Sequence, residues 1–245
     1  MAKDLSKKVE EFANSLEKAL GDNLLSLLLY GPAVRVEGPS IPTTLLVVRD
    51  ASPRALRNIE ATVGGWVKKG FPPPLIFSER EWHESSDVFP IEIEDMREAH
   101  RLLRGTNPLD GIETVREDLR RELEREVRGK LLQLRTEFAA TASDGKALGA
   151  LLADSATTFF VLFRATLRLA GRTPPLDSAA LVKETADLAG FDGTAFDWIL
   201  GKLAGRKQPN LKPHDAVGDH YVEQIELLTH FVDAYETSSE QGSEE

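Results

Sequence analysis

The segment that decides the fold is residues 24–48, LLSLLLYGPAVRVEGPSIPTTLLVV. An apolar run, Leu24–Tyr30, ends at the dipeptide Gly31-Pro32, which is typical of a turn. A loop follows, and a second apolar run, Thr44–Val48, ends at Arg49-Asp50. Short apolar runs bounded by turn residues are typical of buried strands. The segment therefore predicts two strands that are joined by a tight turn and a loop.

Helical patterns and further strands alternate around this segment. Apolar residues recur at helical spacing over Asp4–Leu20, and Ser52–Lys69 begins with an N-cap serine followed by proline. Leu75–Phe77 predicts a short third strand. Val88–Ile93 predicts another strand, because its apolar residues alternate with other residues. Helices that alternate with strands indicate an α/β unit over residues 1–110.

The strand patterns end after this unit, and residues 111–237 have only helical patterns. Five helices joined by short connections predict an antiparallel bundle. Phe159–Phe163 is expected in its core, with a dimer interface as the alternative. The tail, residues 238–245, is acidic and has no apolar residue, so we expect it to be disordered. The helices are expected at Val115–Phe138, Lys146–Ala170, Asp177–Ala189, Thr194–Ala204 and Asp215–Tyr235.

The composition excludes several classes of function. The chain has 245 residues, a net charge of −10 and no cysteine. Acidic residues outnumber basic ones in both halves, which argues against general nucleic-acid binding. The lack of cysteine excludes disulfides, thiolate nucleophiles and cysteine-based metal sites. The apolar runs are shorter than a membrane span, and the N-terminus has no signal-peptide pattern, so we expect a cytoplasmic protein without membrane contact.

Three motifs resemble the nucleotidyltransferase superfamily that includes DNA polymerase beta. Residues 30–35, YGPAVR, occupy the place of the family's Gly-Ser-x-x-Arg turn. Residues 41–48, IPTTLLVV, occupy the place of its Ser-Asp-x-Asp strand. Residues 89–96, FPIEIEDM, resemble the strand with the third carboxylate, which falls at Glu92. Kanamycin nucleotidyltransferase and its relatives also append a helical bundle. The resemblance therefore implies an α+β fold, with a mixed sheet and helices followed by an all-α bundle.

The residues that carry the family's chemistry differ here. The family uses the serine and neighbouring amides of the turn to hold phosphates, and its carboxylates to hold Mg²⁺. Pro32 has neither a hydroxyl nor an N–H group. Pro42 and Thr44 replace the two aspartates, and neither has the negative charge that Mg²⁺ favours in its oxygen ligands. Without these groups, the electrostatic stabilisation that phosphoryl transfer needs is lost.

The remaining residues of these motifs have two interpretations. Arg35 could contact an anion beside Gly31 and Pro32, but an ordinary loop arginine is the favoured interpretation. Glu92, Glu94 and Asp95 are expected at the solvated end of a strand, and the alternative is a residual metal site that includes Glu92.

Three functions remain open on the sequence. The favoured one is a degenerate nucleotidyltransferase-fold protein, without transfer activity, that binds a small molecule or a protein partner. The second is an active enzyme that transfers a nucleoside monophosphate from Mg²⁺-bound NTP to an unknown acceptor. The third is a structural helical module that mediates interaction or dimerisation, so a homodimer stays open. No cofactor is expected unless the second function holds.

Overall fold

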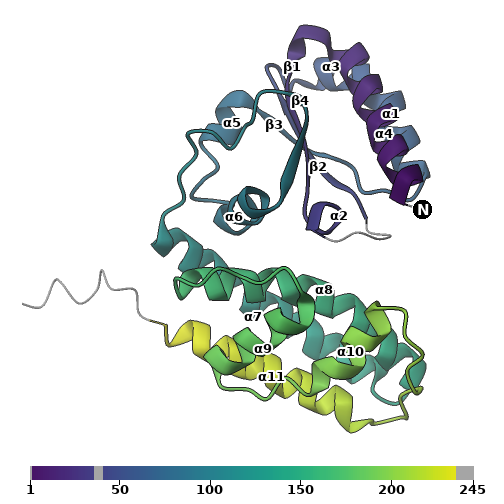
Figure 1. The fold of residues 1–245 in the computed structure, drawn as a ribbon, viewed down its shortest axis with the longest axis vertical. Helices are drawn as coiled ribbons and strands as arrows, with labels where there is room; N and C mark the ends of the chain where they lie inside the picture. The colour runs from purple at the N-terminus through teal and green to yellow at the C-terminus, as the bar shows by residue number, and fades with distance from the viewer. Residues whose placement is uncertain (1, 36–40, 236–245) are drawn as a thin grey trace, which may run out of the picture. The chain divides into compact units, whose positions relative to one another are not determined.

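The computed structural model describes residues 2–35 and 41–235. The chain divides into two compact units, Met1–Val115 and Arg116–Glu245. The first contains a mixed four-stranded sheet and the second is helical (Figure 1). The expected architecture, a mixed sheet with helices followed by a helical region, is present. The expected disordered tail, residues 238–245, lies outside the described residues.

The sheet has the order β3-β2-β1-β4. Its centre consists of β1 and β2, which pair antiparallel, while β3 is parallel to β2 and β4 is antiparallel to β1. The two central strands are the ones that the apolar runs predict. The strands are β1 (Leu24–Tyr30), β2 (Thr43–Val48), β3 (Leu75–Ser78) and β4 (His100–Gly105).

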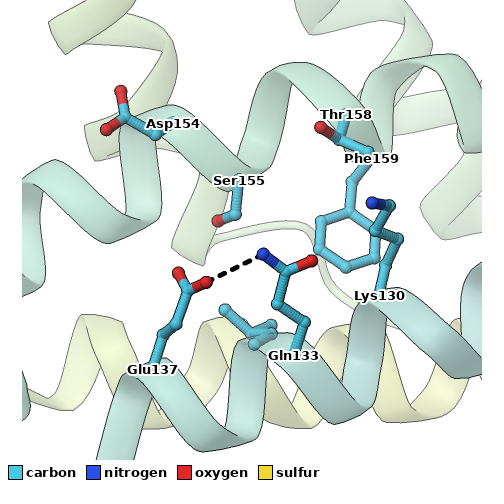
Figure 2. Close-up of a pocket in the computed structure, with 8 residues that line it drawn as sticks. Lys130, Gln133, Glu137, Asp154, Ser155, Thr158 and Phe159 are labelled. Carbon is cyan, nitrogen blue, oxygen red and sulfur yellow. Dashed lines mark hydrogen bonds between the residues drawn. The ribbon is translucent and has the colours of Figure 1, made fainter. Parts of the chain in front are cut away.

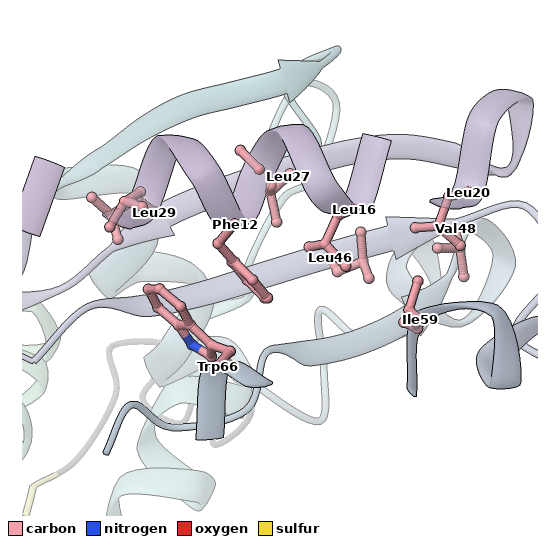
Figure 3. Packing of buried hydrophobic residues seen from close by; sticks show 11 residues of the cluster. Phe12, Leu16, Leu20, Leu27, Leu29, Leu46, Val48, Ile59 and Trp66 are labelled. Atoms are coloured by element: carbon pink, nitrogen blue, oxygen red, sulfur yellow. The ribbon is translucent and has the colours of Figure 1, made fainter. Parts of the chain in front are cut away.

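One face of the sheet packs against α1 (Ala2–Leu20) and α4 (Glu60–Lys68) (Figure 1). Because side chains alternate along a strand, the even-numbered β2 residues Leu46 and Val48 face these helices. Figure 3 shows them with Phe12 and Trp66, whose rings are stacked with centroids 4.3 Å apart.

Between β2 and α4 the chain forms two short helical turns, α3 (Pro53–Leu56) and η2 (Arg57–Ile59). A further turn, η1 (Gly21–Asn23), precedes β1.

The other face packs against α5 (Glu79–His83) and α6 (Pro90–Glu98). The odd-numbered β2 residues Leu45 and Val47 point to this side, with Trp82 and Met96. The Trp82 indole donates a hydrogen bond to the Pro108 carbonyl at 2.6 Å. The sheet therefore has a separate hydrophobic cluster on each face.

Two expectations for this unit are wrong, and one strand was not predicted. Val88–Ile93 is not a strand, because Pro90 begins the helix α6. Proline at a first helical position is favourable, and Ile93 and Met96 share one buried face at a spacing of three residues. The strand β4 was not predicted, since it is a largely polar edge strand. The helix expected over Ser52–Lys69 is interrupted by η2.

The second unit consists of helices over its described residues. The long helix α7 (Arg116–Thr141) packs against α8 (Gly145–Leu169) and α11 (Ala216–Asp233). Two ion pairs, Arg128–Asp233 at 2.9 Å and Arg135–Glu226 at 2.7 Å, show that α7 and α11 are antiparallel. The shorter helices are α9 (Ser178–Ala189) and α10 (Ala195–Leu203).

The helix α8 forms the core of this unit. Phe159 and Phe163 are 1% and 0% exposed, so Phe159–Phe163 lies in the core, as expected. By length and composition alone α8 could cross a membrane, although the apolar runs of the sequence did not indicate this. Half of its most apolar window is buried inside the unit, and the core helix of a globular protein meets the same criteria.

Candidate functional site

The turn after β1 begins the candidate site. Gly31 has φ +75°, a left-handed conformation that favours glycine. Its carbonyl accepts hydrogen bonds from the N–H groups of Val34 and Arg35, which closes the short helix α2 (Pro32–Arg35). The Gly31 N–H donates to the Ala99 carbonyl at 3.3 Å. This N–H group of the turn is therefore used in a hydrogen bond within the protein.

Arg35 lies in a short helix and not in the expected loop. It is the last residue of α2, and its side chain is only 2% exposed. Its Nη1 and Nη2 atoms donate to the two carboxylate oxygens of Asp95, at 3.0 and 2.7 Å. Nη2 also donates to the Asp95 carbonyl at 2.9 Å and lies 3.5 Å from Glu98 Oε2. The guanidinium is thus bound to α6 through a bidentate ion pair with Asp95, a geometry that arginine favours.

The two expected aspartate positions lie at the start of β2: Pro42 directly precedes the strand, and Thr44 is its second residue. Pro42 is buried, and Thr44 is 0% exposed. The Thr44 hydroxyl has no hydrogen-bond partner among the described residues. Thr44 pairs with Leu29 of β1, and the parallel register with β3 begins one residue later, at Leu45 and Leu75. Neither neighbouring strand therefore has a carboxylate beside Thr44.

Glu92 lies on α6 and not on a strand. By strand alternation, Thr44 shares the sheet face of Leu46, whereas α6 packs on the opposite face through Ile93. Glu92 is close to Tyr30, also on that opposite face. Burial raises the pKa of the Tyr30 phenol, and the charges of Glu92 and Asp95 raise it further. Glu92 and Thr44 thus lie on different faces of the sheet.

The expected solvated acidic cluster is divided by α6. Asp95 is 5% exposed and faces Arg35, so the expectation of a solvated residue is wrong for it. Glu94 lies on another side of the helix, where it pairs with Arg97 and accepts a hydrogen bond from the Thr114 hydroxyl. The described residues contain no group of three or more histidine or acidic side chains that could hold a metal ion.

These residues do not fit the Mg²⁺ that the family resemblance implies. Hard divalent cations need several oxygen ligands with negative charge. Proline at 42 supplies no side-chain ligand, and Thr44 supplies one neutral oxygen in an apolar environment. No catalytic step through a metal follows from this arrangement.

Comparison with solved structures decides the fold. No family model and no curated protein sequence matches the chain. Its structure is similar to the crystal structure of spectinomycin adenyltransferase AAD(9) from Enterococcus faecialis with ATP and spectinomycin. The TM-score is 0.59 at 12% identity, and the match covers 93% of this chain and 99% of that chain. This chain has the nucleotidyltransferase-like fold. The match extends over residues of both units, so the helical region is part of the similarity.

Within the nucleotidyltransferase-like fold, sequence reasoning missed the role of Asp95 and Glu98. They are three residues apart on α6 and face one arginine, a spacing that places two side chains on the same helix surface. This relation follows from the sequence only when Pro90 is taken as the start of a helix. With residues 88–93 assigned to a strand, the sequence did not indicate that Asp95 and Glu98 share one helix surface.

The helical unit has a small polar cavity of about 190 Å³ between α7 and α8. Figure 2 shows Gln133 and Glu137 of α7 pointing toward Ser155 of α8, with a hydrogen bond of 2.8 Å between Gln133 and Glu137. Behind it, the Ser155 hydroxyl lies 3.1 Å from that of the buried Tyr221. Ligand pockets usually have about 300–1,000 Å³, so this cavity is small for an organic ligand.

Proposed function

We propose that this nucleotidyltransferase-fold protein does not transfer nucleotides and acts by binding a small molecule or a protein partner. The observation that carries the proposal is the lack of carboxylate side chains at the start of β2. Pro42 and Thr44 stand where the resembling family has its metal-binding aspartates, and Thr44 lies in an apolar environment. The β1 and β3 residues nearest to it include no carboxylate.

The state of Arg35 supports the same conclusion. An arginine beside the turn could bind phosphate only if its guanidinium were accessible. Here its side chain is 2% exposed and is bound to Asp95. Breaking a buried ion pair to bind a ligand costs several kcal/mol. The turn therefore lacks both the metal and the phosphate contacts on which phosphoryl transfer depends.

The remaining properties of the proposal follow from composition. The net charge of −10 favours a small-molecule or protein ligand over nucleic acid. We place the protein in the cytoplasm, with no cofactor and no membrane contact. An active enzyme would need replacement carboxylates around Thr44, and among the described residues the neighbouring strands provide none.

Isothermal titration with ATP and with GTP, each with and without Mg²⁺, tests the proposal. We expect no Mg²⁺-dependent binding heat for the wild-type chain. Mg²⁺-dependent, saturable binding would contradict the proposal and would favour the active enzyme.

A restoration variant gives the matched comparison. Pro32→Ser, Pro42→Asp and Thr44→Asp together return the hydroxyl and the two carboxylates of the family motif. If the variant gains Mg²⁺-dependent nucleotide binding that the wild type lacks, the three substitutions account for the loss. Equal Mg²⁺-dependent binding by both proteins would show that these positions do not decide it. Circular dichroism establishes that the variant is folded, since a buried aspartate at 44 is destabilising.

A further inference from the structure

The helical unit has a larger cavity, of about 550 Å³, at the N-terminal end of α8. Residues 145, 146, 149 and 150 of α8 line it, together with Trp198 and Lys202 of α10 and the dipeptide Asn210-Leu211. Its volume lies in the range of about 300–1,000 Å³ that is usual for small-molecule sites. It is separate from the degenerate turn of the first unit and is tested independently of it.

Two glycines in the first turns of α8 shape this cavity. Glycine inside a helix costs about 1 kcal/mol relative to alanine, so its presence needs a reason. A Cβ at Gly145 would lie 1.9 Å from the Leu211 carbonyl oxygen, which crosses the helix there. A Cβ at Gly149 would lie 3.0 Å from Cη2 of Trp198. The glycines thus allow the Leu211 backbone and the Trp198 ring to approach α8 closely.

The Trp198 ring forms a fixed aromatic wall. Its Nε1–H donates to the Pro209 carbonyl at 2.9 Å, which sets the orientation of the indole. Trp198 is half-buried, whereas the other two tryptophans, Trp66 and Trp82, are each 2% exposed. An oriented ring that is partly open to a cavity can stack on a flat ligand with little loss of side-chain entropy.

The charged residues that line the cavity are two lysines. Lys146 lies in the first turn of α8 and Lys202 in the last turn of α10, and both are exposed. Neither forms an ion pair within 4 Å among residues 2–35 and 41–235. The nearby Asp144 does not line the cavity and accepts hydrogen bonds from the Lys146 and Ala147 N–H groups at 2.8 and 3.1 Å. In a chain with a net charge of −10, this lining is positive.

We propose that this cavity binds a small organic anion, with its flat apolar body against Trp198 and its acidic group held by Lys146 and Lys202. The apolar wall and the two ammonium groups are complementary to such an amphipathic ligand. The N-terminal end of α8 adds the positive end of a long helix to the same region.

Titration of the full chain with 1-anilinonaphthalene-8-sulfonate tests this site, because the probe has a flat aromatic body and one negative charge. We expect saturable binding with energy transfer from tryptophan, and loss of most of the transfer in Trp198→Phe. Lys146→Met and Lys202→Met should each weaken binding about fivefold, the size expected for one partly exposed charged contact. Gly149→Ala, which displaces the Trp198 ring, should also weaken it.

Two controls separate the site from general hydrophobic binding. Lys183→Met removes an exposed lysine from α9, outside the cavity, and should leave the dissociation constant unchanged. N-phenyl-1-naphthylamine has the same aromatic body without the sulfonate, so its binding should be insensitive to both cavity lysines. Absence of saturable anion binding, or equal binding by wild type, Lys146→Met and Lys202→Met, would overturn the proposal.

Discussion

Arg35 and Thr44 differ sharply in how their buried polar groups are satisfied, although both lie in motifs that resemble one active site. The Arg35 side chain is 2% exposed, and both of its Nη atoms donate to the Asp95 carboxylate, although its Nε has no hydrogen-bond partner among the described residues. The Thr44 hydroxyl is 0% exposed and has no hydrogen-bond partner among the described residues. Where the family resemblance implies charges that face a bound nucleotide, this chain has one internal ion pair and one isolated hydroxyl. Removal of the guanidinium would leave a buried carboxylate without its charged partner, whereas removal of the Thr44 hydroxyl would leave no polar group unpaired.

The largest effect is expected from breaking the ion pair. Arg35→Met leaves the Asp95 carboxylate buried without its guanidinium, which should lower the free energy of unfolding by about 3–5 kcal/mol. Urea denaturation measures the change. The control Lys7→Met, which removes an exposed pair with Glu11, should cost less than about 1 kcal/mol. A cost for Arg35→Met as small as that of the control would contradict the account.

Thr44→Asp should have the next largest effect. A carboxylate at this position enters an apolar environment with no hydrogen-bond donor provided for it, so we expect a loss of about 2–4 kcal/mol at neutral pH. Burial raises the pKa of such a carboxyl, so the loss should shrink as the pH falls and the group is protonated. Thermal unfolding between pH 4 and pH 8 checks this. An equal loss of stability at pH 4 and at pH 8 would show that the charge of the carboxylate does not cause the destabilisation.

Thr44→Val sharpens the comparison, because valine has nearly the shape of threonine without the hydroxyl. Removal of an unpaired buried hydroxyl should leave stability unchanged or raise it by about 1 kcal/mol. The same urea measurement applies. A loss of more than about 1 kcal/mol would mean that the hydroxyl has a stabilising partner.

The smallest effect concerns Tyr30 and appears only at high pH. Burial, Glu92 and Asp95 raise its pKa, whereas for Tyr221 burial raises the pKa and the Ser155 hydrogen bond lowers it. A phenol whose pKa is raised on folding stabilises the fold fully below its unfolded value of about 10, and this stability is lost as the pH rises above that value.

Alkaline titration followed by tyrosinate absorbance measures this difference. Glu92→Gln should lower the pKa of Tyr30 and leave that of Tyr221 unchanged, because Glu92 acts only on the first. Tyr30→Phe identifies the Tyr30 transition. An unchanged Tyr30 transition in Glu92→Gln would contradict the placement of Glu92 beside the phenol.

The sequence was informative where one signal was dominant. The apolar runs of β1 and β2 and the helical periodicity of α1, α7 and α11 predicted the corresponding elements. It was misleading at residues 88–98, where alternating Phe89, Ile91 and Ile93 fit a strand as well as the first turn of a helix that begins with proline. The polar edge strand β4 had no apolar signal to detect.

The same ambiguity affected the candidate site. Asp95 and Glu98 converge on Arg35 because α6 is a helix and packs on one particular face of the sheet. The face is determined by tertiary packing, which local sequence patterns do not contain. The replacement of the aspartates by Pro42 and Thr44 required no structure, whereas the burial of Thr44 did.

The most direct test of the central claim uses Mn²⁺, which binds the same hard oxygen ligands as Mg²⁺ and is paramagnetic. Electron paramagnetic resonance of Mn²⁺ and ATP, with and without the full chain, measures protein-bound metal. We predict that the wild-type chain leaves the Mn²⁺–ATP spectrum unchanged. A saturable, protein-dependent change that Glu92→Gln abolishes would contradict the account and show that the site holds a metal–nucleotide complex.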